Sequence, residues 1–191
     1  GVALNGKTKG GLVYTVMYGN YSSNKGEDNK GKAVYGRLGY ESKQVYLEGN
    51  ATVASDNGTD YTFLSGFGGM KGDWGRLGAG YMQQRKKKDD SDAETVGAIS
   101  GFAAVNAGKN LEVFARYDHL TDLAFKDIGD YLPVAASQYK ARLLMAGLNF
   151  KVHKMVSISP NVKMVTYSGD NHPKADVWFN LTALVNFKTD I

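Results

Sequence analysis

Charged residues recur at the polar positions of segments in which apolar and polar residues alternate, and they are the first candidates for chemistry. The set comprises Arg37, Glu48, Arg76, Glu112, Arg116, Asp118 and Lys163. Charges that face an enclosed interior either line a path for water or pair with each other. Because basic and acidic groups are nearly balanced in this set, we expect ion pairs and hydrogen bonds, with a mild preference for anions if a path is open. Arg116 and Asp118 lie two residues apart on one face and are placed to pair with neighbouring strands.

Motifs for catalysis are weak in this sequence. Asp118 and His119 are adjacent, and adjacent residues of a strand point to opposite faces, so they cannot work together inside a strand. The stretch GFGGMKG has Lys71 where a dinucleotide fingerprint requires its last glycine, and no helix follows it. The histidines His119, His153 and His172 lack the close spacing of a metal site. We therefore expect no enzyme activity, no cofactor and no metal.

The composition favours a β protein with many turns. Aromatic residues make up 12% of the chain, and there are 24 glycines but only 3 prolines. The net charge of +4 comes from 23 basic and 19 acidic residues that are mixed along the chain, without the basic stripe of a nucleic-acid binder. Cysteine is absent, which excludes disulfides and thiolate chemistry. No apolar run approaches the roughly 18 residues of a membrane-spanning helix.

Alternation with a period of two residues predicts about ten strands. Their expected ranges are Gly11–Tyr21, Ala33–Tyr40, Val45–Ala54, Tyr61–Lys71, Gly75–Arg85, Ala93–Val105, Leu111–Leu120, Gln138–Val152, Val156–Tyr167 and Ala175–Phe187. Most of them are near the length of about 9 to 11 residues that a tilted strand needs to cross a bilayer. No linker or change of composition divides the chain, so we expect a single domain over residues 1–191.

The connections between these segments alternate in length. SSNKGEDNKGK, KKKDDSD, TDLAFKDIGDYLPVAAS and SGDNHPK are long and polar, whereas ESKQ, GDW, NAGKN and HKM are tight. Only SDNGTD is shorter than the alternation requires. Outer-membrane barrels have short periplasmic turns and longer external loops. With an even number of strands, both ends of the chain would lie in the periplasm.

The distribution of charge decides what the apolar face meets. In the last segment, ADVWFNLTALVNF, the residues from Val177 to Phe187 at odd positions are apolar, and those at even positions are mostly polar. The polar faces carry about one charge per strand, and the charges gather in the connections. A soluble barrel would carry abundant charge outside. We therefore predict an all-β protein, an up-and-down antiparallel transmembrane β-barrel, whose apolar face meets lipid.

Aromatic residues on the proposed outer face gather near both ends of the strands. Tyr18, Tyr81 and Tyr117 come near the external ends, and Tyr40, Phe150 and Phe187 come near the periplasmic ends. Amphipathic rings favour both interfaces of a membrane, so this arrangement is typical of two aromatic girdles.

The C-terminal part of the sequence resembles a known class of proteins. LEVFARYDHLTD and, after a loop, ARLLMAGLNFKVHKMVSISPNVKMVTY resemble the closing strands of porin-type outer-membrane barrels, including the phosphate-selective porin group. The similarity covers roughly the last 80 residues and is one of style. Such porins have about 16 strands, more than this chain supplies. Phe187 resembles the terminal aromatic residue by which the insertion machinery recognises these barrels, although four residues follow it.

Two external segments are candidates for binding. The loop from Thr121 to Ser137 is rich in apolar residues, and we expect it to pack on its own barrel or to bind a partner protein, alone or in a larger membrane complex. Lys86, Lys87 and Lys88 would stand at the external rim, where they could bind lipopolysaccharide phosphates. The other expected partner is the lipid of the outer membrane, and no nucleic acid is expected.

These observations favour a small porin-like channel in the bacterial outer membrane, through which small polar solutes diffuse passively. Three alternatives remain. They are a plugged barrel with a structural or adhesive role, a soluble lipocalin-like barrel that binds a ligand, and an external protease resembling omptins, which use Asp and His near the external rim.

Overall fold

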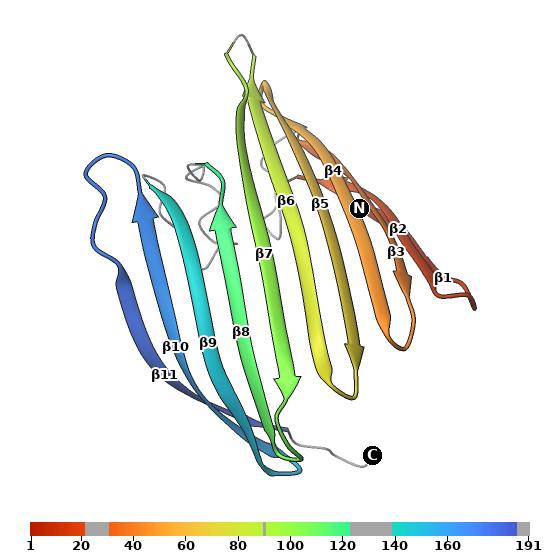
Figure 1. The fold of residues 1–191 in the computed structure, drawn as a ribbon. Helices are drawn as coiled ribbons and strands as arrows, with labels where there is room; N and C mark the ends of the chain where they lie inside the picture. Colours follow the sequence, from red (N-terminus) through yellow and green to blue (C-terminus); the bar gives the residue numbers. More distant parts are fainter. Residues whose placement is uncertain (22–30, 90, 123–138, 187–191) are drawn as a thin grey trace. The chain divides into compact units, whose positions relative to one another are not determined.

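The chain is built from strands that pair with their neighbours in sequence. The structure is a computed structural model that describes residues 1–21, 31–89, 91–122 and 139–186 (Figure 1). Within these ranges one sheet of 11 strands has the order β1 to β11, and every pairing given below is antiparallel. The strands are β1 (Val2–Lys7), β2 (Leu12–Asn20), β3 (Lys32–Glu41), β4 (Val45–Asp56), β5 (Thr59–Gly72), β6 (Gly75–Lys88), β7 (Glu94–Asn106), β8 (Leu111–Leu120), β9 (Lys140–His153), β10 (Val156–Ser168) and β11 (Asp176–Val185). The prediction of an all-β, up-and-down fold is confirmed.

Each of the predicted segments corresponds to one strand. The range Leu111–Leu120 is the same in sequence and structure, and the largest difference, at the end of β6, separates Arg85 from Lys88. Alternation was therefore a sufficient signal for these strands, because each has one apolar and one more polar face.

The structure adds one strand that the sequence did not reveal. β1 has 6 residues and pairs with β2 so that Val2 lies opposite Tyr18. At the other end of the order, Val185 lies opposite Val156, beside the tight turn of Lys154 and Met155. Because Val2 lies opposite Tyr18, β1 begins at the end of β2 that leads into the long connection to β3. The expected even number of strands was wrong, because the described ranges contain 11.

The contacts between residues group the chain into two compact units. The first contains residues 1–70 and 79–99, and the second contains residues 71–78 and 100–191. That residues 1–191 form a single domain stays a prediction.

In the first unit, register places the large apolar side chains on one face. Tyr14 lies opposite Leu38, Leu38 opposite Gly49, and Gly49 opposite Gly66. Leu38 is 60% exposed, and the other large apolar residues at the same parity of β2 and β3 are exposed as well. The buried residues Ala33 and Ala54 lie opposite each other on the other face. The apolar face of this unit is thus its exposed face.

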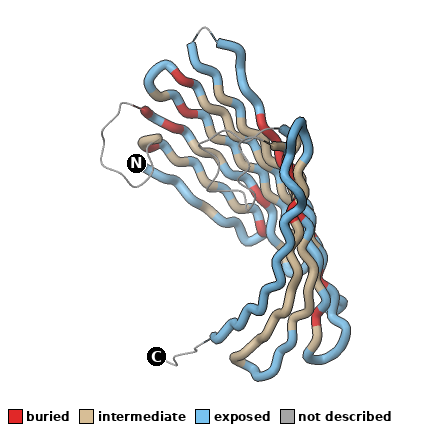
Figure 2. The backbone as a smooth tube through the Cα atoms, turned by 90° about the vertical axis from the view of Figure 1, so that its left-hand side faces the viewer, coloured by how far each residue is buried: buried red, intermediate tan, exposed pale blue. Residues whose placement is uncertain are grey.

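The second unit has the same inversion. In β11 every residue is exposed, including Phe179 at 86% (Figure 2). The buried residues Leu143 and Val165 lie opposite each other on the face that also carries Lys163. A folded protein in water buries its large apolar side chains first. This distribution is the one expected of strands whose outer surface meets lipid.

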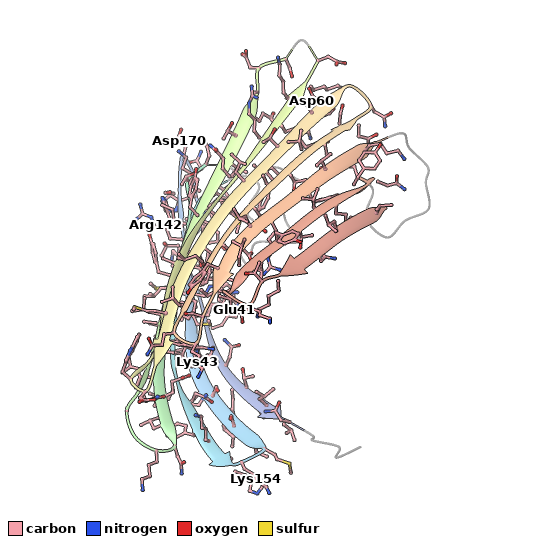
Figure 3. All side chains as sticks on the ribbon, turned by 90° about the vertical axis from the view of Figure 1, so that its right-hand side faces the viewer. Glu41, Lys43, Asp60, Arg142, Lys154 and Asp170 are labelled. Carbon is pink, nitrogen blue, oxygen red and sulfur yellow. The ribbon has the colours of Figure 1, made fainter. Side chains whose placement is uncertain are left out.

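The connections agree with the predicted alternation only in part, because Lys86, Lys87 and Lys88 of one connection predicted to be long lie in β6. Asn57 and Gly58 join β4 to β5 with positive φ angles of 47° and 72°, which is typical of a two-residue Asn-Gly hairpin turn. Lys43 and Lys154 lie in tight turns, whereas Asp170 lies in the longer connection from β10 to β11 (Figure 3). No helix in the described ranges is long and apolar enough to span a membrane.

Candidate lumen face and its ion pairs

The seven charged candidates all lie in strands, and the structure joins six of them in pairs. Arg37 is in β3, Glu48 in β4, Arg76 in β6 and Lys163 in β10, and β8 carries Glu112, Arg116 and Asp118. The ion pairs are Arg37 with Glu48, Arg76 with Glu112, and Arg116 with Asp118. Each acidic member of the set therefore binds a basic one. That these residues line a lumen stays a prediction.

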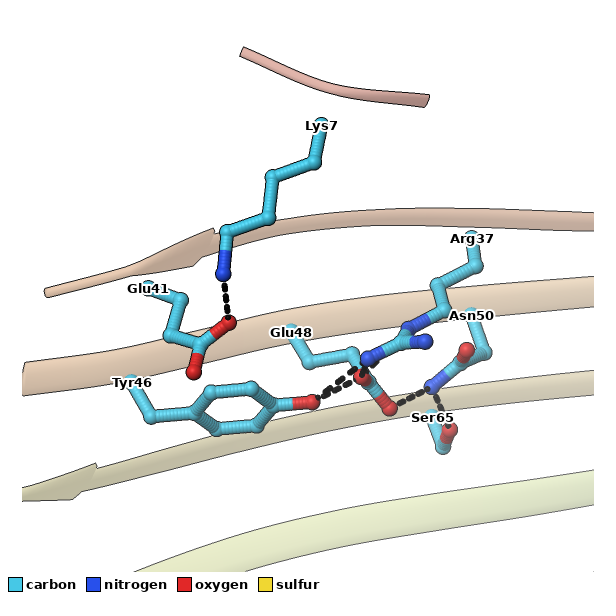
Figure 4. A network of polar contacts seen from close by, with 7 residues as sticks. All are labelled: Lys7, Arg37, Glu41, Tyr46, Glu48, Asn50 and Ser65. Carbon is cyan, nitrogen blue, oxygen red and sulfur yellow. Dashed lines mark hydrogen bonds and ion pairs between the residues drawn. The ribbon is translucent and has the colours of Figure 1, made fainter. Parts of the chain in front are cut away.

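In the first unit a polar network links β3, β4 and β5 (Figure 4). Arg37 Nε donates to Glu48 Oε2 at 2.6 Å, and Arg37 Nη2 donates to the Tyr46 hydroxyl at 2.9 Å. The Tyr46 hydroxyl in turn donates to the same carboxylate. Asn50 donates to Glu48 Oε1 at 2.9 Å and to the Ser65 hydroxyl at 3.2 Å. Three strands are thus connected by side chains across one face.

Tyr46 and Asn50 were not among the predicted site residues. Both lie two positions from Glu48, so they share its face of β4. This spacing was visible in the sequence. A search restricted to charged residues missed them because their contributions here are a hydroxyl and an amide.

A more exposed pair lies near the tight turns of the same unit. Lys7 Nζ is 2.8 Å from Glu41 Oε2, with side-chain exposures of 59% and 48% (Figure 4). Glu48, by contrast, has a side-chain exposure of 19%. The Lys7–Glu41 pair is therefore screened by solvent far more than the Arg37–Glu48 pair.

In the second unit the most buried charge is held by two hydrogen bonds. Arg76 Nη1 and Nη2 donate to the two carboxylate oxygens of Glu112 at 2.6 and 3.0 Å. This fork geometry matches the planar guanidinium to the carboxylate. Arg116 Nε donates to both oxygens of Asp118 at 3.1 and 2.9 Å. The expectation that Arg116 and Asp118 pair with neighbouring strands was wrong, because their spacing on one face lets them reach each other.

Lys163 differs from the other three basic residues. Among the described residues it has no ion-pair partner, and its ammonium lies 5.1 Å from the centroid of the Trp178 ring. Trp178 lies directly opposite Lys163 in the β10–β11 register. The sequence places Trp178 on the mostly polar face of the last strand, but its contact with Lys163 depends on the register between β10 and β11.

Neutral polar groups continue the same face. Ser159 donates to the Asn149 side chain at 2.9 Å, and Asn180 donates to the Asn161 side chain at 3.3 Å. Asn149 and Ser159 also line a depression of about 290 Å³ in the second unit. Its lining includes the charged residues Arg76, Glu112 and Arg116 and the apolar residues Phe102, Phe114 and Met145.

The proposed aromatic girdles are only partly described. Tyr18, Tyr40, Tyr117 and Phe150 all lie on the exposed apolar face and within three residues of a strand end. Tyr81 is exposed too, but it lies near the middle of β6, because that strand continues to Lys88. Phe187 is outside the described residues. The two-girdle arrangement stays a prediction.

The candidate acid and base of a protease are not assembled here. The Asp118 carboxylate is held by Arg116, and His119 follows it in β8, with its side chain on the other face. The Nδ1 atom of His119 is buried and has no hydrogen-bond partner. In the ranges that the structure covers, no group of three His, Cys, Asp or Glu residues is placed to hold a metal ion.

The three lysines at the end of β6 do not share one face. The Lys86 ammonium lies 5.9 Å from the Tyr61 ring centroid, and Tyr61 stacks on Tyr21 at 4.7 Å. Lys87 has the opposite parity, like Arg85, and both are exposed. The apolar loop predicted to pack on the barrel or to bind a partner lies, from residue 123 on, outside the described residues.

Several solved structures share this arrangement of strands. An anion-selective porin from Comamonas acidovorans matches with a TM-score of 0.70 and 13% identity, over 96% of this chain and 55% of that one. The siderophore receptor PirA from Acinetobacter baumannii matches with a TM-score of 0.54 and 13% identity, over 97% and 38%. The NanC porin matches with a TM-score of 0.52 and 7% identity, over 97% and 91%. The chain therefore shares the up-and-down antiparallel fold of these outer-membrane β-barrels.

The similarity is one of fold. This chain spans about half the length of the anion-selective porin, 55% of it. No protein-family model matches the sequence, and no curated protein matches it either.

Proposed function

We propose that this chain forms a non-enzymatic channel in the bacterial outer membrane, through which small polar solutes diffuse passively. The observation that carries the proposal is the contrast between the two faces of the strands. Large apolar side chains such as Leu38 and Phe179 are exposed on one face, and ion pairs and amide hydrogen bonds occupy the other. A closed barrel with this contrast turns its apolar face to lipid and encloses the polar one.

The exposed face also argues against the soluble alternative. Val2, Leu4 and Leu181 are exposed by 77%, 64% and 73%, and they belong to a set that extends over most strands. Soluble monomers rarely expose so many large apolar side chains on one face of their strands. A soluble lipocalin-like barrel would bury these side chains inside.

The charges of the polar face suit uncharged and weakly charged solutes. Three of the four basic residues in the candidate set are each matched by a carboxylate. Paired charges bind solutes less strongly than isolated ones, and passive conduction requires that solutes also leave. The same pairs support the plugged-barrel alternative equally well, so only a transport measurement separates the two.

Single-channel recording in a planar lipid bilayer tests the proposal. The full chain, refolded in detergent, is expected to give stepwise increases of conductance on insertion. Silence across many insertions that are verified independently would support the plugged barrel. Monodispersity in buffer without detergent would support the soluble barrel. Either result would overturn the channel.

The proposed lipid partner at the external rim is lipopolysaccharide. Arg85 and Lys87, rather than all three lysines, support this part of the proposal because they are exposed on the parity of Tyr81. Replacing both with Gln should weaken binding to lipopolysaccharide vesicles by roughly fivefold per charge. Lys43→Gln with Lys154→Gln, in tight turns, is the control with the same net charge. Equal weakening by both double variants would refute a specific site. A partner protein at the long connections also stays part of the hypothesis.

A further inference from the structure

One row of side chains on the polar face of the second unit differs from its neighbours. Arg116 of β8 lies opposite Met145 of β9, Met145 opposite Lys163 of β10, and Lys163 opposite Trp178 of β11. Neighbouring strands are about 4.8 Å apart, so the row is about 15 Å long. We call these four residues the Lys163 row.

The Lys163 row has more positive than negative charge. The Asp118 carboxylate accepts hydrogen bonds from Arg116 Nε. In the described part of the chain, the two terminal amino groups of Arg116 have no hydrogen-bond partner. Lys163 has no ion-pair partner in the same part. The carboxylate diagonal to Lys163, Asp176, accepts a hydrogen bond of 2.7 Å from the Tyr167 hydroxyl.

The row on the other side of Lys163 adds no charge. It consists of Phe114, Gly147, Asn161 and Asn180, which lie opposite one another in turn. The adjacent row on the other side carries the carboxylates of Asp118 and Asp176, which bind Arg116 and the Tyr167 hydroxyl, and among the described residues neither forms an ion pair with Lys163. An anion that reaches the Lys163 row can therefore bind two cationic side chains.

The same row presents apolar surface beside its cations. Trp178 is 42% exposed, and the Lys163 ammonium over its ring holds both side chains in place. Met145 lies between the two cations, and with Arg116 it lines the depression of about 290 Å³. An ammonium, guanidinium donors and an aromatic ring fit a carboxylate that is attached to an apolar body.

We propose that the Lys163 row is a binding site for organic carboxylates. The role of the site in transport rests on the proposed channel function. Binding itself does not, because it can be measured on the folded protein without any conductance.

The two tryptophans of the chain make the test direct. Trp74, in the tight turn between β5 and β6, is 43% exposed, and Trp178 is 42% exposed, so a neutral quencher should reach both. The Trp74→Phe variant reports Trp178 alone, and the Trp178→Phe variant reports Trp74 alone. Quenching by iodide, an anion, is compared with quenching by neutral acrylamide in the folded protein in detergent.

The ratio of the iodide quenching constant to the acrylamide quenching constant should be higher for Trp178 than for Trp74. In the Trp74→Phe background, Lys163→Gln should lower the iodide constant of Trp178 about two- to fourfold at low salt and leave the acrylamide constant unchanged. Lys163→Arg should keep the higher ratio, and Lys154→Gln in the β9–β10 turn should keep it too. If Lys163→Gln changes the acrylamide constant of Trp178, that variant is misfolded. The test then rests on Lys163→Arg, in which the ratio should still be higher for Trp178 than for Trp74.

Competition identifies the class of ligand. Cyclohexanecarboxylate should protect Trp178 from iodide, and its neutral amide should not. An iodide constant that does not respond to Lys163→Gln, or equal protection by the amide, would overturn the site. If the quenching and competition results are as expected but no conductance steps appear in bilayers, the channel function is refuted and the binding site is supported. If conductance steps appear but Lys163→Gln leaves the iodide constant unchanged, the binding site is refuted and the channel function is supported.

Discussion

The most buried charge of the polar face is the Glu112 carboxylate, and its ion pair with Arg76 offsets the cost of burying it. The Glu112 side chain is 5% exposed, whereas that of Arg76 is 53% exposed. Removing the arginine leaves a buried carboxylate without its partner, which costs more than removing the charge of the glutamate. The two halves of this pair are therefore not equivalent.

We expect Arg76→Met to lower the free energy of unfolding by about 1–3 kcal/mol, with the lower part of the range reflecting the exposure of Arg76. Glu112→Gln should cost about 1 kcal/mol or less, because the amide oxygen still accepts from Arg76. Urea-induced unfolding from lipid vesicles, followed by circular dichroism, measures both. Equal losses, or a larger loss for Glu112→Gln, would contradict this assignment.

Sequence alone could identify charged side chains but only some of their partners. Arg116 and Asp118 lie two apart on one face, so their pair depends only on local strand geometry. Arg76 and Glu112 are 36 positions apart, and their contact depends on how distant strands are aligned. The contact of Lys163 with Trp178 depends on strand register in the same way. The alternation predicts a face, and register then decides which residues on that face meet.

Among the strands, those with clear alternation were the easiest to predict. β8 was found with its observed bounds because Leu111, Val113 and Ala115 alternate with Glu112, Phe114 and Arg116. β1 was missed because its 6 residues, VALNGK, give a short pattern that includes glycine. One short strand was enough to turn the predicted even number of strands into the observed 11.

The tight turn before β6 depends on a glycine. Gly75 has a φ of 136°, and a Cβ atom there would lie 2.0 Å from the backbone oxygen of Ala104. Gly75→Ala should therefore lower the free energy of unfolding by about 1–3 kcal/mol.

The matched control is Gly108→Ala in the turn between β7 and β8, where an added Cβ would meet nothing within 4 Å. This variant should stay within about 0.5 kcal/mol of the wild-type protein. Both variants can be measured by the same urea unfolding in vesicles. A neutral Gly75→Ala would show that the turn adopts another conformation.

For the sheet as a whole, the decisive property is which face meets hydrocarbon. The distribution of charge along the sequence predicted that the apolar face meets lipid, and the exposed apolar residues and the fold agree with this prediction. What the sequence could not give is the arrangement of the polar side chains. Networks such as Arg37 with Tyr46 and Glu48 arise only after neighbouring strands are placed in register.

Spin labels on β11 test this orientation most directly. The chain has no cysteine, so single cysteines can be introduced at Phe179, Asn180, Leu181 and Thr182 without a background. In lipid vesicles, labels at 179 and 181 should be more accessible to oxygen, which dissolves in hydrocarbon. Labels at 180 and 182 should be more accessible to a water-soluble nickel complex. The reverse alternation, or none across the four positions, would contradict the claim that the apolar face meets lipid and the polar face is enclosed.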